Sequence, residues 1–165
     1  MTILAADGLS AHIRPAGPED VPQLLAFIRD MAVFERMTTA ATVESLHEAL
    51  FGDPPAACAQ LAFVDSRPAA YLTYYFTFGS MTGRRGLWLD DVYVAPEYRG
   101  RGLGRALMRH LAGIARQHQC ARFEWLVLDW NESALGLYQS LGAQVLEDHR
   151  VCRLDEAGIR ALAQG

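Results

Sequence analysis

A glycine-rich turn contains the residues best placed to bind a ligand. Two carboxylates precede a short apolar run that ends at residue 94. The turn that follows contains Arg99, Gly100, Gly102 and Gly104 and leads into a helical pattern. Glycines let the backbone approach a ligand closely, and the first N–H groups of a helix have no partner within it. Such groups, together with the positive end of the helix dipole, bind phosphate. The turn therefore predicts a phosphorylated cofactor.

Two familiar phosphate-binding patterns do not fit this turn. A P-loop ends in Gly-Lys-Ser/Thr, and the chain contains no lysine, which also excludes a Schiff base on a lysine. The dinucleotide fingerprint needs Gly-x-Gly-x-x-Gly, whereas here the third glycine is Gly104 and Arg105 stands where that glycine should fall. What remains is an Arg-x-x-Gly-x-Gly turn after a valine-rich strand.

The elements that must position this turn predict an α/β fold. Apolar residues at helical spacing and β-branched or aromatic runs, separated by Gly and Pro, mark the elements. We expect helices at residues 19–37, 43–50, 103–117, 131–141 and from 156, and strands at 12–14, 59–64, 70–78, 87–94, 123–128 and 145–154, the last one a strand or a hairpin. An antiparallel meander followed by a parallel crossover gives a mixed central sheet flanked by helices. No repeat or linker divides the chain, so we expect one domain at residues 11–163.

Composition narrows the classes of function. The 165 residues are 51% hydrophobic with a net charge of −4, which is typical of a soluble globular protein and does not favour nucleic acid as a partner. No apolar run is long enough to cross a membrane, and no signal peptide is evident. Cys58, Cys120 and Cys152 are odd in number and stand in apolar contexts, so we expect buried thiols and a cytoplasmic protein. Neither the cysteines nor the histidines show metal-ligand spacing, so we expect no metal.

The whole chain resembles the GNAT superfamily of N-acetyltransferases. Within it, the sequence is most similar to the spermidine/spermine (diamine) and thialysine N-acetyltransferases. The segments that carry the resemblance are Phe34-Glu35-Arg36-Met37, residues 70–77, residues 87–94, residues 98–104, and Trp130-Asn131-Glu132 with the helix up to Tyr138. The resemblance implies acetyl-CoA as cosubstrate, a sheet that is splayed at the acetyl-CoA strand, and a homodimer.

Acetyl transfer to an amine first needs the amine to lose a proton. A free alkylamine has a pKa of about 10.4, so its neutral form costs about 4–5 kcal/mol at pH 7 unless a carboxylate takes the proton. Asp90 and Asp91 stand before the cofactor strand, and neighbours on a strand face opposite ways, so only one should face the amine. The resemblance assigns that role to Asp90, acting directly or through a water. It also places substrate contacts at Phe34 and Glu35, and we add Glu124 and Trp125 as candidates for the same cleft.

The thiolate that leaves must gain a proton. Tyr138 lies seven residues after Asn131, about two helical turns, and the resemblance makes it the general acid that reaches the cofactor sulfur. A phenol with a pKa near 10 can protonate a thiolate whose conjugate acid has a pKa near 8.5. The remaining cofactor contacts implied by the resemblance are Val92, Tyr93, Val94, Arg99, Gly100, Arg101, Gly102, Leu103, Gly104, Arg105, Asn131, Ser133 and Tyr138. Asn131 is also a good helix N-cap.

The sequence departs from the polyamine-acetylating relatives near its last expected strand. Those relatives carry an acidic pair followed by Gly-Trp, whereas this chain has Glu147, Asp148 and then Arg150, without the Trp. Spermidine and spermine are therefore doubtful, and an arginine favours a substrate that also bears a carboxylate. The expected function is acetylation of a small primary amine, such as a diamine, a polyamine or a thialysine-like amino acid. Two alternatives remain open: a protein or peptide N-acetyltransferase, and a non-catalytic acetyl-CoA-binding module.

Overall fold

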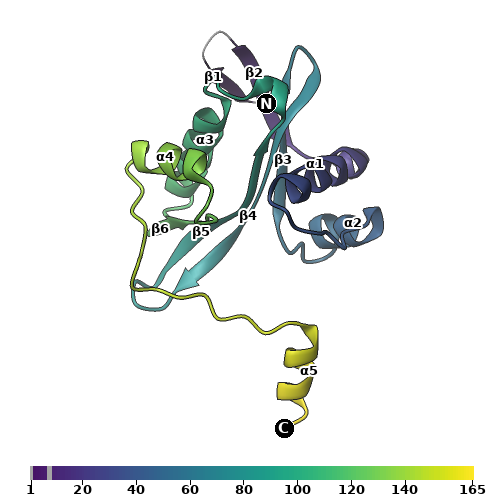
Figure 1. Cartoon of the computed structure of the whole chain (residues 1–165), viewed down its shortest axis with the longest axis vertical. Coiled ribbons are helices and arrows are strands. Elements are labelled where there is room, and N and C mark those ends of the chain that lie inside the picture. Colours follow the sequence, from purple (N-terminus) through teal and green to yellow (C-terminus); the bar gives the residue numbers. More distant parts are fainter. Residues whose placement is uncertain (1, 7–8) are drawn as a thin grey trace. The chain divides into compact units, whose positions relative to one another are not determined.

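A computed structural model describes residues 2–6 and 9–165 of the chain (Figure 1). Its elements in chain order are β1 (Thr2–Ala6), β2 (Leu9–Pro15), η1 (Pro18–Asp20), α1 (Val21–Phe34), α2 (Val43–Phe51), β3 (Cys58–Val64), β4 (Arg67–Gly79), β5 (Arg84–Val94), η2 (Pro96–Tyr98), α3 (Leu103–Gln117), β6 (Arg122–Glu124), α4 (Glu132–Ser140) and α5 (Glu156–Ala163). They fall into two units, Met1–Leu128 and Asp129–Gly165. Each unit is described by itself.

The first unit is built on a six-stranded sheet with the strands in chain order, β1 to β6. All neighbours are antiparallel except β5 and β6, which run parallel, so the predicted mixed sheet with a meander and one crossover is confirmed. The parallel pairing is short and ends where Trp88 lies opposite Glu124. Over residues 89–94, β5 therefore has no ladder partner on its β6 side among the described strands. This is the splaying that the resemblance implies.

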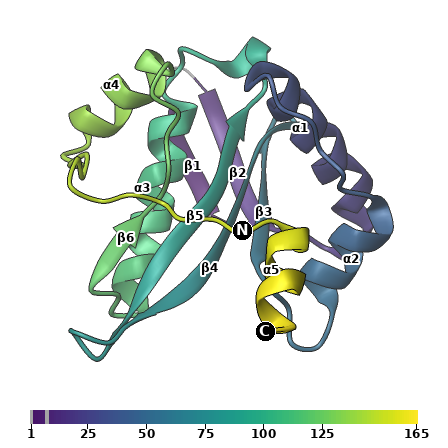
Figure 2. The ribbon, with the colours of Figure 1, turned by 60° about the horizontal axis from the view of Figure 1, so that its bottom comes forward.

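The two faces of this sheet are covered by different helices. Figure 2 shows α1 and α2 on one side of the strands and α3 on the other. On the α1 face, Leu24 and Phe27 pack with Tyr71 and Tyr93 in a cluster of buried residues. Burying apolar area of this kind stabilises the fold by about 25 cal/mol per Å². The same packing places the carboxyl end of α1 near the middle of β4 and β5.

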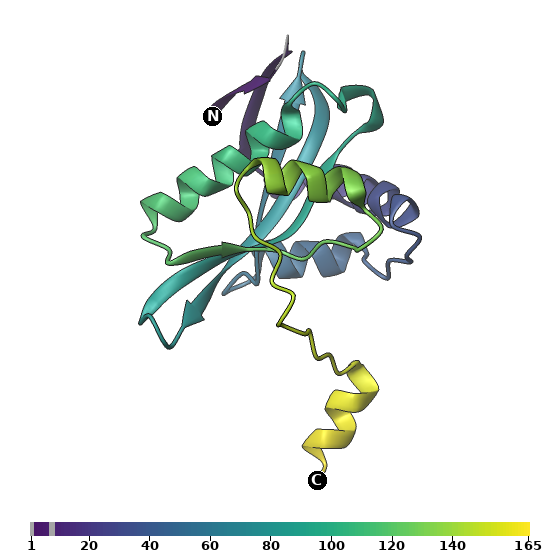
Figure 3. The same ribbon diagram turned by 60° about the vertical axis from the view of Figure 1, so that its left-hand side comes forward.

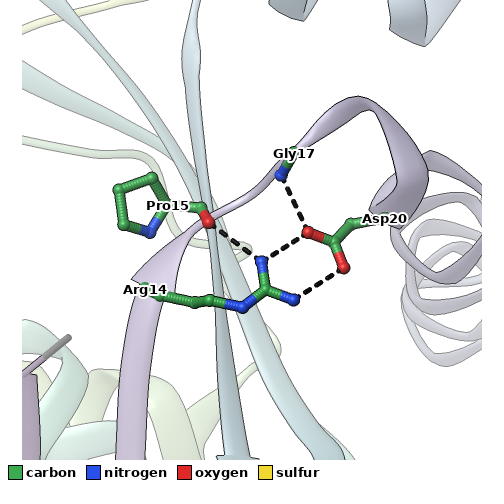
Figure 4. Close-up of polar contacts among 4 residues, drawn as sticks. All are labelled: Arg14, Pro15, Gly17 and Asp20. Atoms are coloured by element: carbon green, nitrogen blue, oxygen red, sulfur yellow. Dashed lines mark hydrogen bonds and ion pairs between the residues drawn. The ribbon is translucent and has the colours of Figure 1, made fainter.

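The start of α1 is tied to the sheet by an ion pair (Figure 4). Arg14 in β2 donates from Nη2 to Oδ1 of Asp20 at 2.9 Å, and the backbone N–H of Gly17 donates to Oδ2 at 2.8 Å. The bonded guanidinium holds the pKa of Asp20 below its ordinary value. The link fixes how the chain leaves the sheet and enters α1, and so helps to fix where the other end of that helix lies.

Several predicted elements need correction. Helix α1 ends at Phe34 rather than residue 37, since Arg36 adopts a left-handed conformation with φ of 57°. The strand expected at 123–128 is only β6, and β1 was not predicted. The strand or hairpin expected at 145–154 is absent: this stretch contains no strand (Figure 3). Its apolar side chains Val145 and Val151 are exposed, because a strand forms only where a neighbouring edge accepts its hydrogen bonds. The helix expected from residue 156 is confirmed as α5.

The expectation of buried cysteines is also wrong. Cys58 and Cys152 are exposed and Cys120 is half-buried, although all three are free thiols. Cys58 is the first residue of β3, where the strand emerges from the sheet, so its apolar sequence neighbours did not indicate burial. Among the described residues, no helix is both long and apolar enough to cross a membrane.

Candidate functional site

A β-bulge at Asp90 changes how the two neighbouring carboxylates are presented. Thr73 pairs with Asp91 and Tyr74 pairs with Leu89, so Asp90 is an extra residue without a partner in β4. A bulge breaks the strict alternation of a strand and re-aims side chains. The expectation that only one of the two carboxylates faces a given site assumed regular alternation, which the bulge interrupts, and it stays a prediction. Both raise the pKa of the same phenol, that of Tyr71, through their charge.

Asp91 is the more deeply placed of the pair. It lies two residues before Tyr93 on the α1 face of β5, where Tyr93 and Tyr71 stand opposite each other. Oδ2 of Asp91 accepts a hydrogen bond of 3.2 Å from the Tyr71 hydroxyl, which also lies 3.5 Å from Sδ of Met31 in α1. The carboxylate is thus held between β4, β5 and the last turns of α1.

Glu35 adds a third carboxylate from the end of α1. It is the C-cap residue of that helix and is half-buried. Its charge raises the pKa of both Asp91 and Tyr71, as the charge of Asp90 also does. We call Glu35, Asp90 and Asp91 the acidic cluster. Within the described part of the chain, no three His, Cys, Asp or Glu side chains are grouped so that they could hold a metal ion. The negative charge of the cluster suits a cationic ligand.

The acidic cluster changes the protonation of its own members. Burial, together with the charges of Asp90 and Glu35, raises the pKa of Asp91 to about 6, against the lowering effect of the Tyr71 hydrogen bond. Burial also raises the pKa of Asp90 and of Glu35. Perturbed carboxyl groups of this kind are common where a protein binds a cation or moves a proton. An ammonium group would supply the positive charge that the cluster lacks.

The glycine turn has the backbone that a phosphate seat requires. Gly100 and Gly102 have φ of 70° and 78°, a left-handed conformation that side chains disfavour. Gly102 is the N-cap of α3, and the first bond within the helix runs from the Ala106 N–H to its carbonyl. Leu103 itself is buried in the core, so only its backbone can face a ligand. Arg101 is exposed, and Arg105 and Gly104 are half-buried in the first turn. The predicted helix over residues 103–117 is confirmed with these bounds.

Arg99 is engaged by the protein itself. Its Nε donates to the carbonyl of Val94 at 2.8 Å. Its guanidinium lies over the rings of Phe34 and Tyr93, with 4.9 Å and 5.4 Å to the ring centroids. Arg99 thus connects the end of β5 to the end of α1, next to Glu35 in the sequence. A contact between Arg99 and a cofactor phosphate stays a prediction.

The open side of β5 carries the other expected cofactor contacts. Val92 and Val94 are half-buried, whereas the Tyr93 side chain is packed in the core beside Phe27. Backbone donors and acceptors along an unpaired strand edge are available to a ligand. At Val94 the carbonyl already accepts from Arg99, so it has one lone pair left for a ligand.

Glu124 and Trp125 are placed by contacts of their own. Glu124 in β6 forms an ion pair with Nε of Arg122 at 2.7 Å, which neutralises its charge locally. The Trp125 ring lies 4.8 Å from that of Phe123. Their expected part in binding the substrate stays a prediction, and the charge of Glu124 is the least available of the expected acids.

In the second unit, Asn131 is the N-cap of α4. Its Oδ1 accepts from the N–H of Ala134 at 3.2 Å, so the capping role is confirmed. Ser133 is exposed in the first turn of that helix, and Tyr138 is half-buried in its second half. The expected cofactor contacts of Asn131 and Ser133, and the acid role of Tyr138, stay predictions.

The sequence profile of the Acetyltransferase (GNAT) family matches residues 22–143, more than half of the chain. The chain belongs to the GNAT acetyltransferase family. It is 34% identical over 149 residues to a thialysine N-epsilon-acetyltransferase of Mus musculus, covering 84% of this chain and 87% of that one, and 32% identical over 151 residues to one of Caenorhabditis elegans, covering 88% and 92%. Among solved structures, an integron cassette protein of V. cholerae has the same fold, with a TM-score of 0.79 and 24% identity over 94% of this chain and 98% of that one.

Membership of the GNAT family settles the class of activity. The chain is an acetyl-CoA-dependent N-acetyltransferase, as the resemblance implied. The positive-φ turn before α3 fits the phosphates of this cosubstrate, and the open edge of β5 fits its extended arm. Two residues of the site were not predicted from the sequence, Asp91 and Tyr71. Asp91 was visible as a neighbour of Asp90, but no local pattern marks a bulge, and Tyr71 reads as an ordinary strand residue.

The glycine turn of this GNAT protein can be tested by its stability. Gly100→Ala adds a Cβ that meets no atom within 4 Å, so its cost comes only from the left-handed backbone, about 1–2 kcal/mol. We expect the free energy of unfolding to fall by that amount in urea titrations. The control is Gly113→Ala in the middle of α3, where a Cβ also meets open space and helix propensity predicts a gain of about 0.5–1 kcal/mol. Equal effects of the two substitutions would contradict the strain at Gly100.

Proposed function

We propose that the chain acetylates the side-chain amine of a thialysine-like amino acid, and that the acidic cluster receives the amine as its ammonium ion. The observation that carries this is the Asp91 carboxylate, which is held by the buried Tyr71 hydroxyl at 3.2 Å and whose pKa is raised by the charges of Asp90 and Glu35. Carboxylates that raise one another's pKa are stabilised in their charged forms by a bound cation. The curated relatives of Mus musculus and Caenorhabditis elegans, named for thialysine N-epsilon-acetylation, support the same class of substrate.

The presence of Arg150 supports an amino acid over a polyamine. The resemblance implies an acid in the corresponding stretch of polyamine-acetylating relatives, which suits a second cationic group, whereas this chain has an arginine there. Arginine binds carboxylates through paired hydrogen bonds. A substrate with one amine and one carboxylate therefore matches the chain better than spermidine. Acetylation of a small diamine remains the second candidate, because the acidic cluster alone would accept it.

The proposed reaction uses the chain's own groups for two proton transfers. Asp91 or Asp90 takes a proton from the bound ammonium, directly or through a water, and frees the nitrogen lone pair. The nitrogen then forms a bond to the acetyl carbon while the bond from that carbon to sulfur breaks. Tyr138 gives its hydroxyl proton to the departing thiolate. The acylated nitrogen then loses its remaining extra proton to water, which leaves the neutral amide, and the Tyr138 phenolate takes a proton back from water. Backbone N–H groups on the open edge of β5 are placed to stabilise negative charge on the acetyl oxygen, a contribution of about 3 kcal/mol where such a donor is well oriented.

We also propose a cytoplasmic homodimer that needs neither a membrane nor nucleic acid. The homodimer is implied by the resemblance, and the free thiols of the three cysteines fit a reducing compartment. Size-exclusion chromatography with light scattering measures the mass in solution, and a monomer would contradict the dimer.

The substrate proposal is tested by thiol release from acetyl-CoA with a panel of amines. The panel holds thialysine, lysine, putrescine, spermidine and a peptide with a free N-terminus, with a no-amine control. We expect thialysine to give the highest kcat/KM and spermidine a value at least tenfold lower. A preference for putrescine would favour the diamine candidate, and a preference for the peptide would favour the protein N-acetyltransferase. Tight acetyl-CoA binding without release by any amine would favour the binding module and contradict the proposal.

A further inference from the structure

Tyr71 places a polar group in the apolar core directly behind the acidic cluster. Its side chain is fully buried, and its ring is fixed by the rings of Phe27 and Tyr93, with centroids 6.0 Å and 6.2 Å away. A buried hydroxyl without a partner would cost about 1–3 kcal/mol, so a phenylalanine would be the simpler choice for packing alone. Core packing alone therefore does not explain why a tyrosine rather than a phenylalanine stands at this position.

The Tyr71 hydroxyl donates a hydrogen bond to Asp91. The Tyr71 hydroxyl has a single proton to donate, and its two neighbours are Oδ2 of Asp91 at 3.2 Å and Sδ of Met31 at 3.5 Å. A carboxylate is a far stronger acceptor than a thioether, so the proton goes to Asp91. This bond uses Oδ2 and leaves Oδ1 of the same carboxylate for another donor. Because core packing fixes the ring, the carboxylate is held in one orientation.

The hydrogen bond also offsets the repulsion inside the acidic cluster. The titratable groups that face Asp91 are Tyr71 from β4, Asp90 from its own strand and Glu35 from the end of α1. Burial and the two carboxylates favour the protonated form of Asp91, and only the Tyr71 bond favours the charged form. Without that bond, a larger share of Asp91 would be protonated near neutral pH and could neither hold an ammonium group nor take its proton.

We infer that Tyr71 is a positioning residue for acetyl transfer: its buried hydroxyl holds Oδ2 of Asp91, which leaves Oδ1 to receive the proton of the substrate amine. The inference rests on the proposed function, because it needs a cationic amine at the acidic cluster. It goes further by assigning to the protein core a part in setting the acid side of the reaction's pH profile. Tyr71 acts through Asp91 and need not touch the substrate itself.

The test is the pH dependence of kcat/KM for Tyr71→Phe, measured with thialysine from pH 5 to pH 9. The substitution removes one oxygen atom and leaves the ring packing in place. Removing the bond raises the pKa of Asp91, so we expect the acid limb of the profile to move to higher pH. At pH 7 we expect kcat/KM to fall about tenfold or more, the factor that corresponds to a hydrogen bond to a charged group.

The matched control is Tyr74→Phe, the same change three residues along β4. The hydroxyl of Tyr74 is directed to Cys58 and Gln60 rather than to the acidic cluster, so its removal should leave the acid limb where it is. A second variant separates positioning from stability: in an Asp91→Asn background, Tyr71→Phe should produce no further change in the profile.

The outcomes distinguish the inference from the function on which it rests. A wild-type protein that is inactive toward every amine of the panel would remove the proposed function and the inference with it. An active wild type with an unmoved acid limb in Tyr71→Phe would overturn the inference alone. So would equal shifts for Tyr71→Phe and Tyr74→Phe, or loss of folding in Tyr71→Phe by circular dichroism, since either result would make the hydroxyl a structural group.

Discussion

Tyr138→Phe should lower kcat about 100- to 1,000-fold and leave the affinity for acetyl-CoA nearly unchanged. The substitution removes the proposed proton donor to the thiolate and keeps the ring on α4. General acid catalysis typically contributes a factor of about 10² to 10⁴. A residue that acts only on the departing sulfur affects the transition state and not the ground-state complex, so the loss should fall on kcat rather than on cofactor binding. Thiol release measures the first quantity and isothermal titration calorimetry the second.

Ser140→Ala is the control for this experiment. It removes a hydroxyl from the last residue of the same helix, where Ser140 donates to the carbonyl of Leu137 at 2.6 Å, and it leaves Tyr138 intact. We expect near wild-type kcat for this variant. If Tyr138→Phe turned over as fast as Ser140→Ala, Tyr138 would not be the acid. If it also lost acetyl-CoA affinity by a large factor, its role would be in binding.

The turn and the helix after it could be predicted because local rules determine both. Left-handed backbone at Gly100 and Gly102 needs glycine, and the apolar residues that follow recur with the period of a helix. The bounds of α3 are therefore as expected. The order of the strands from β2 to β6 followed from the alternation of apolar runs and turns, and a parallel crossover after the meander was expected as well.

The features that were missed depend on contacts between distant residues. The bulge at Asp90 exists only in the pairing of β5 with β4, and the burial of Asp91 depends on α1 packing above it. Residues 145–154 alternate well enough for a strand, but a strand also needs a partner edge. Sequence patterns report what a segment favours by itself. They do not report which other segments it contacts in the fold, and the acidic cluster depends on contacts between β4, β5 and α1.

Asp91→Asn should give a protein that is more stable and much less active. Asparagine has nearly the same shape and still accepts a hydrogen bond from Tyr71, but it has no charge for an ammonium group and cannot take a proton at neutral pH. We expect kcat/KM for thialysine to fall about 100-fold or more, within the range of a lost general base. The same change removes a half-buried charge that repels Asp90 and Glu35.

The gain in stability should follow a defined pH dependence. The pKa of Asp91 is about 6 in the folded protein and near 3.8 when unfolded, so only well below pH 3.8 is the carboxyl protonated in both states, and there the two proteins should be equally stable. Between pH 4 and 6 the unfolded chain gives up this proton more readily than the folded one, and the wild type loses stability relative to the variant. Above pH 6 the difference should level off at about 1–3 kcal/mol, at 1.36 kcal/mol per unit of pKa shift.

Urea unfolding at about pH 3, 6 and 8 measures this difference, with Asp90→Asn as the matched neighbour. Asp90 is nearer the surface, so its replacement should gain less stability. The activities of the two variants then show which carboxylate receives the amine. A larger loss for Asp90→Asn would assign that role to Asp90, as the resemblance implied. A variant at Asp91 that kept its activity and unfolded more easily would show that this carboxylate serves the fold. Loss of activity with a gain in stability would show that repulsion between Asp91 and the neighbouring carboxylates lowers the stability of the fold but is needed for activity.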